Sequence, residues 1–141
     1  MSKTKKRYCY GRYIALLAMC LMASATFAQK QLAINKIFEQ YGKQKGSTMV
    51  VLSDDVIKSY HLDFYKSITL PYDKKRSNEI QQSLETDKKL AKKIKEVISN
   101  GIIYSGYYQL PMEGKLKNRY ILFKISDNAT ATLIYMEGDI E

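Results

Sequence analysis

Apolar residues recur every three or four positions in some segments and every second position in others, which predicts helices interspersed with strands. The first periodic segment, residues 31–43, places Ile34, Ile37, Phe38 and Tyr41 on one face of a helix. Two strand-forming runs follow it, separated by a segment that begins with the helix-capping residues Ser53–Asp55. They predict a strand over 48–53, a short helix over 56–61 and a strand over 64–70 that ends at Pro71.

The longest periodic segment runs from Ser77 to Ser99 and predicts a helix that ends at Asn100–Gly101. Its apolar residues form one stripe, and a set of lysines occupies the opposite side. The set consists of Lys88, Lys89, Lys92, Lys93 and Lys95. Asp87 falls within the apolar stripe, and because an unpaired buried carboxylate is costly, it requires either a partner or exposure to water.

Three strand-like runs separated by turn residues complete the chain, at 102–111, 119–125 and 130–136. We expect the middle run to be the central strand, with Ile121, Phe123 and Ile125 facing the helices. The order of elements predicts the α+β class: an antiparallel sheet that ends in a three-stranded meander, with helices packed on one face.

The first 28 residues have the pattern of a secretory signal peptide. A basic head is followed by the uncharged run Tyr13–Phe27 and by small residues that lead to Ala28. We therefore expect cleavage between Ala28 and Gln29, a single domain over 29–141, and a periplasmic or secreted protein. The alternative is a lipoprotein anchored through Cys20, but Met19 is unsuited to such a signal.

Removal of the signal peptide changes the composition. The whole chain has a formal net charge of +9, but without the five basic residues of the signal 18 basic residues face 14 acidic ones, a net +4. The modest charge and the expected export argue against a nucleic-acid partner. Both cysteines are also lost, which excludes disulfides, thiolate catalysis and cysteine-based zinc sites from the processed chain.

Three stretches, "IFEQYGKQKGSTMVVLS", "SLETDKKLAKKI" and "RYILFKIS…LIYMEGDIE", resemble one family. It is a domain-of-unknown-function family, number 6108, of small exported proteins from Gram-negative anaerobes, to which family 4252 is similar. The resemblance implies an envelope location and an α+β domain. It transfers no activity and no catalytic residues.

No catalytic, cofactor or metal site is predicted. His61 is the only histidine, and Asp54, Asp55 and Asp63 lack the spacing of a calcium loop. Adjacent acids at a helix start are already explained by the helix dipole. No nucleophile has a recognisable base beside it in the sequence.

The candidate binding residues are tyrosines of the first meander strand and lysines of the predicted long helix. They are Tyr104, Tyr107, Tyr108, Lys89, Lys92 and Lys93. Strand alternation places Tyr107 on the face opposite Tyr104 and Tyr108.

The leading hypothesis for function is a non-catalytic module that binds an envelope protein or glycan, with no cofactor. One alternative is a binder of anionic membranes or polyanions through the Lys88–Lys95 face. The other is a small carboxylate-dependent hydrolase, because carboxylate pairs assemble in space rather than in sequence.

Overall fold

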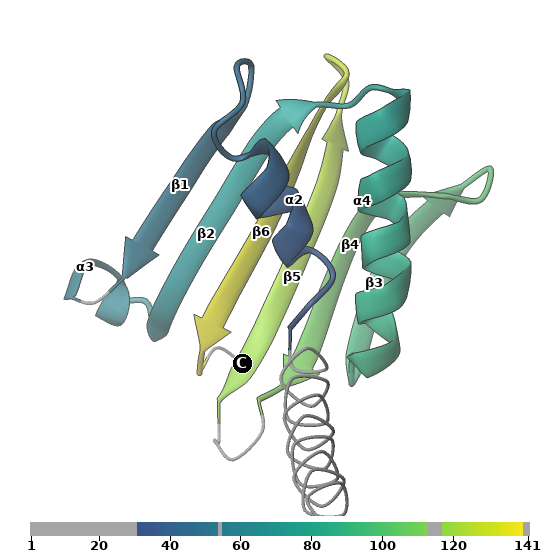
Figure 1. Cartoon of the computed structure of the whole chain (residues 1–141). Helices are drawn as coiled ribbons and strands as arrows, with labels where there is room; N and C mark the ends of the chain where they lie inside the picture. The colour runs from purple at the N-terminus through teal and green to yellow at the C-terminus, as the bar shows by residue number, and fades with distance from the viewer. Residues whose placement is uncertain (1–30, 54, 113–116, 140–141) are drawn as a thin grey trace, which may run out of the picture. The chain divides into compact units, whose positions relative to one another are not determined.

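Six antiparallel strands form one sheet in the order β1-β2-β6-β5-β4-β3 (Figure 1). The computed structural model describes residues 31–53, 55–112 and 117–139. The predicted signal peptide, the Ala28–Gln29 cleavage site, Cys20 and Asp54 therefore lie outside the described residues. The described residues from Ala33 onward belong to one compact unit.

Within the described residues, four helical segments accompany the six strands. The strands are β1 (Thr48–Ser53), β2 (Leu62–Pro71), β3 (Lys93–Ser99), β4 (Ile102–Pro111), β5 (Asn118–Ser126) and β6 (Thr130–Gly138). The helices are α2 (Asn35–Tyr41), α3 (Asp55–Lys58) and α4 (Lys74–Asp87), followed by the 3-10 turn η1 (Lys88–Leu90).

The chain reaches both edges of the sheet before it fills the centre. Along the chain, β1 and β2 come first and are paired at one edge of the sheet. Helix α4 then connects β2 to β3, which forms the opposite edge. From β3 to β6 consecutive strands pair as a meander, and β6 closes the sheet by pairing with β2. The α+β class predicted from the sequence is confirmed.

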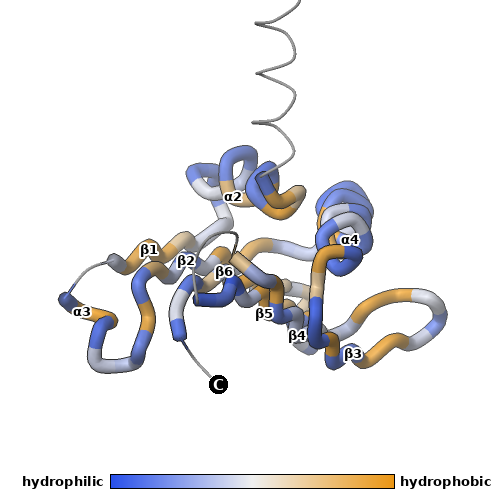
Figure 2. The backbone as a smooth tube through the Cα atoms, turned by 90° about the horizontal axis from the view of Figure 1, so that it is seen from below, coloured by the Kyte–Doolittle hydropathy of each residue, from blue (hydrophilic) through white to orange (hydrophobic). Residues whose placement is uncertain are grey.

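Helices α2 and α4 lie over the same side of the sheet (Figure 2). Directly paired residues share a face, and one such row on this side runs through Ile68, Leu133 and Phe123, all buried. From the helices, Phe38 and Ile80 are buried as well. Each such side chain contributes about 1.5–3 kcal/mol through burial.

The predicted helix over 77–99 is wrong in its second half. Helix α4 begins at Lys74, where the Asp73 side chain accepts a hydrogen bond from the backbone N–H of Arg76 at 2.9 Å, and it ends at Asp87. Residues Lys93–Ser99 form the edge strand β3 and pair with β4. The segment is rich in β-branched residues, and sheet pairing overrides a helical spacing in such a run.

The predicted meander is confirmed in its three strands, and β3 adds a fourth in front of them. Strand β5 lies between β4 and β6 as expected. Ile121 and Phe123 are buried on the helix side, whereas Ile125 is half-buried. The short helix predicted over 56–61 is present as α3, which starts one residue earlier and ends at Lys58.

Candidate functional site

The side of the sheet turned away from α2 and α4 carries no described helix over strands β3 to β6 (Figure 2). We call this side the open face. The strand register places two neighbouring rows of side chains on it. One row contains Lys95, Tyr107, Leu122 and Ile134, and the next contains Val97, Ser105, Lys124 and Thr132.

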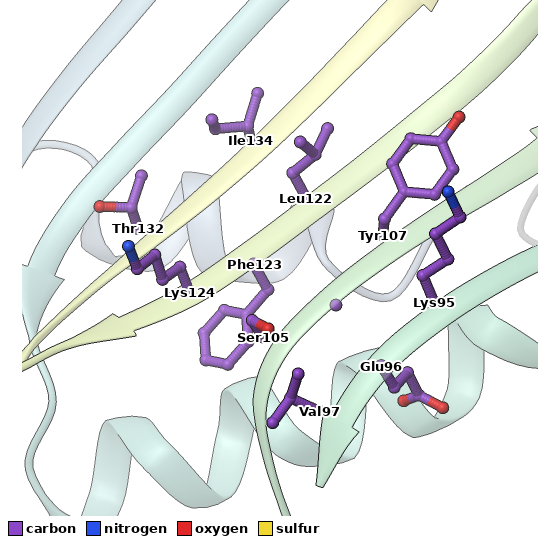
Figure 3. Close-up of a pocket in the computed structure, with 11 residues that line it drawn as sticks. Lys95, Glu96, Val97, Ser105, Tyr107, Leu122, Phe123, Lys124, Thr132 and Ile134 are labelled. Atoms are coloured by element: carbon purple, nitrogen blue, oxygen red, sulfur yellow. The ribbon is translucent and has the colours of Figure 1, made fainter.

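The two rows line a hollow of about 550 Å³ on the open face (Figure 3). Leu122, Ile134 and Tyr107 make much of its lining apolar, and Lys95 and Lys124 bring two cations to it. A second hollow of about 800 Å³ shares Lys95 and Tyr107 with the first and also includes Lys93. The two hollows therefore form one shallow surface beside the β3 edge.

The lysines of the open face have no carboxylate partner among the ion pairs of the described residues. Glu96 lies between Lys95 and Val97, but alternation turns it to the helix side. There it accepts a hydrogen bond from the Tyr108 hydroxyl at 2.7 Å and lies 3.5 Å from the Lys88 ammonium. The open face therefore combines apolar surface with uncompensated positive charge.

Gly106 and Tyr108 support the sheet beneath the hollow. The Tyr108 ring lies across Gly106, and a Cβ atom on Gly106 would be 2.5 Å from the Tyr108 hydroxyl oxygen. Burial and the hydrogen bond to Glu96 raise the pKa of Tyr108, so the hydroxyl keeps its proton and remains a donor. A glycine is therefore required here to let the ring pack flat on β4.

The predicted tyrosines do not share one surface. Tyr107 lies half-buried on the open face and Tyr108 is buried on the helix side, so alternation places these two as expected. Tyr104 sits at the irregularity in the β3–β4 register, where Ile103 and Ser105 have partners and Tyr104 has none. It is 44% exposed and lines neither hollow of the open face.

The predicted lysine face is also divided. Lys88 and Lys89 lie in η1, Lys92 follows it, and Lys93 and Lys95 lie on β3. Of the three lysines predicted as binding residues, only Lys93 lines a hollow of the open face. The prediction missed Leu122, Lys124 and Ile134, although Leu122 and Lys124 share a parity within β5 that could have indicated them.

Asp87 has the partner that its apolar surroundings require. The residue is 2% exposed, and its carboxylate accepts hydrogen bonds from the backbone N–H groups of Ala33 at 2.7 Å and Ile34 at 2.9 Å. These donors precede α2, so the last residue of α4 caps the start of another helix. Burial raises the pKa of Asp87 despite these two hydrogen bonds, and the carboxylate serves the fold rather than the open face.

Other acidic residues are held by neighbouring side chains. Tyrosine hydroxyls bond to Glu79, Glu96 and Glu137, and lysines pair with Asp55 and Asp63. Within residues 31–53, 55–112 and 117–139, no group of three or more potential metal ligands gathers.

His61 ends the turn after α3 and adopts a left-handed φ of 60°. Its carbonyl oxygen accepts a hydrogen bond from the N–H of Asp139 at 3.0 Å. It lies three residues beyond Lys58, the last residue of α3.

Comparison with known proteins shows the family of this chain and assigns no function to it. None of the helices in the described part of the chain is both long and apolar enough to span a membrane. No curated protein and no solved structure matches the chain. The suggested similarity to family 4252 and the Gram-negative anaerobic origin stay predictions. The model of one family, described as a family of unknown function (DUF6108), matches residues 21–141, and the chain belongs to that family.

Proposed function

We propose that the protein is an exported, non-catalytic binding module whose open face takes an anionic amphiphile, a ligand with an apolar body and a negative group. The observation that supports this most directly is the hollow on β3–β6, where apolar side chains lie beside Lys95 and Lys124.

The proposal that the ligand has an apolar body rests on the apolar side chains that the central strands present on the open face. A sheet covered by helices on one side normally presents polar residues on the other. Here Leu122, Ile134 and Tyr107 occupy the outward positions of three adjacent strands. A continuous apolar area on an otherwise polar surface is typical of an interaction site.

The proposal that the ligand carries a negative group rests on Lys93, Lys95 and Lys124, which border the same surface. The volume of each hollow falls within the range of about 300–1,000 Å³ that is common for small-ligand sites. A shallow surface across several strands fits an acyl chain or aromatic body laid flat, with its acid group against a lysine. Envelope lipids and lipid-linked glycans have this chemistry.

The proposal that the module is non-catalytic is supported by the contacts of Glu96, the acidic residue beside the hollow. Glu96 is the one carboxylate residue among those that line the first hollow, and Tyr108 and Lys88 hold it on the helix side. A carboxylate-dependent hydrolase needs two acids that flank one substrate. The membrane-surface alternative relied on a continuous helical lysine face, which the strand β3 replaces.

Binding of anilinonaphthalene sulfonate, an anionic aromatic dye that fluoresces in apolar sites, tests the proposal. The double variant Lys95→Gln/Lys124→Gln should weaken binding about tenfold, because each exposed ion pair contributes up to about 1 kcal/mol. Leu122→Asn should weaken it through the lost apolar contact.

The matched control is Lys89→Gln/Lys92→Gln, which removes the same charge from positions that do not line the hollows. It should bind the dye as the natural protein does. Equal affinities for all of these variants would place the dye elsewhere and contradict the proposed site.

A further inference from the structure

The two edges of the sheet are protected to different degrees. Natural proteins block edge strands with lysines, prolines and bulges that discourage pairing with another chain. The β3 edge has two of these devices, Lys93 with Lys95 and a register shift between Val97 and Ile98. Strand β1, with the sequence TMVVLS, has no charge, no proline and an unbroken register with β2.

Strand β1 is exposed along almost its whole length. It pairs only with β2 within the described chain, so its outer backbone groups face away from the sheet. Val50 and Val51 are 41% and 52% exposed, and they point to opposite faces because they are adjacent in the strand. An uncharged, regular edge of this kind is a template for another strand.

The charges at the ends of β1 indicate which strand fits. Lys43 and Lys45 precede it, and Asp55 follows it; all three are exposed. Lys58 lies 3.3 Å from Asp55, but a pair this exposed contributes little. A segment that is basic before and acidic after an uncharged strand is complementary to itself when two copies run antiparallel.

We propose that two copies of this chain pair through β1, antiparallel, around a two-fold axis perpendicular to the sheet. Residues near the middle of the strand, Val50 or Val51, then face their own counterparts, as an isologous contact requires. The basic start of each β1 lies against the acidic end of the other. This interface is independent of the ligand site on β3–β6.

The geometry of the pair has a consequence for the open face. A two-fold axis perpendicular to the sheet keeps both sets of helices on one side. The open faces of both copies then point in the same direction and form one surface. Two ligand sites on one surface allow simultaneous contact with a ligand-bearing membrane or polymer, which raises avidity without new contacts.

Sedimentation velocity of the protein purified from cells that express the whole chain tests the pairing. The natural protein should sediment as a dimer at micromolar concentration, and Val51→Lys should sediment as a monomer because the change puts a charge on the edge. The matched control is Ile98→Lys on β3, where the natural side chain is also 52% exposed. It should remain a dimer.

Charge reversal tests the antiparallel arrangement itself and does not alter the strand. Lys45→Glu and Asp55→Lys should each weaken the dimer roughly tenfold, since each places like charges together. The double variant Lys45→Glu/Asp55→Lys should restore the natural dissociation constant. A monomeric natural protein, a dimer broken equally by Ile98→Lys, or a double variant weaker than both single variants would overturn the proposal.

Discussion

At the residue scale, Asp87 is the side chain whose role the pattern left open. It holds the start of α2 from the end of α4, so one carboxylate connects two helices that are distant in the sequence. Tyr41 makes a second connection between the same helices, because its hydroxyl bonds to Glu79. Burial together with Glu79 raises the pKa of Tyr41 to about 12. These polar contacts orient α2, which is only seven residues long.

Replacement of Asp87 tests this role. Asp87→Ala leaves two N–H groups without their acceptor, and we expect it to lower the free energy of unfolding by about 2–3 kcal/mol. Asp87→Asn keeps one acceptor oxygen and should cost less. Chemical denaturation of both variants measures the difference. Equal stability of Asp87→Ala and the natural protein would contradict the capping role.

The same residue sets a pH dependence. Because the folded pKa of Asp87 is raised, the folded state holds this proton more tightly than the unfolded state. The part of its contribution to stability that comes from proton binding is therefore complete below the ordinary carboxyl pKa and is lost as the pH rises through the raised value. The stability of the natural protein relative to Asp87→Asn should fall across that interval.

At the scale of elements, β5 shows how one strand serves two surfaces. Ile121 and Phe123 face the helices, and Leu122 and Lys124 face the hollow. Phe123 packs against Tyr72, with ring centroids 6.3 Å apart. The fold and the binding surface are therefore built from alternate residues of the same segment, and each can be altered separately.

Substitutions at neighbouring positions of β5 test this division. Phe123→Ala should lower the free energy of unfolding by about 3–5 kcal/mol, the range for truncation of a buried aromatic residue. Lys124→Ala, the control on the open face, should change stability by less than about 0.5 kcal/mol. Denaturant titration measures both. A loss under about 1 kcal/mol for Phe123→Ala would show that the side chain is not part of the core.

At the scale of the whole molecule, location decides which ligands the open face can meet. The mass of the native protein should correspond to residues 29–141, with or without cyclisation of Gln29, because Ala28 is the last residue of the small-residue cleavage region of the signal pattern. Intact mass spectrometry of the protein from its natural host provides the measurement. A chain that retains Met1, or one that begins at a lipidated Cys20, would contradict this prediction.

The sequence alone was sufficient to predict an element where the local pattern of residues favours the same structure as the pairing of strands in the sheet. Residues 64–70 alternate with period two, and the runs that became β4, β5 and β6 are strand-like and bounded by turn residues, so the α+β class and most strands follow from the sequence. The position of Tyr107 opposite Tyr108 follows from the same alternation. The core position of Phe123 does as well.

Only the tertiary structure decided the state of Lys93–Ser99 and the composition of the site. The segment has helical spacing, but the unpaired edge of β4 and the β-branched side chains favour a strand, and the sequence does not show that such an edge is available. The hollow combines residues from β3, β4, β5 and β6, whose order across the sheet is a long-range property. The same holds for Asp87, because its partners lie more than fifty residues away in the chain.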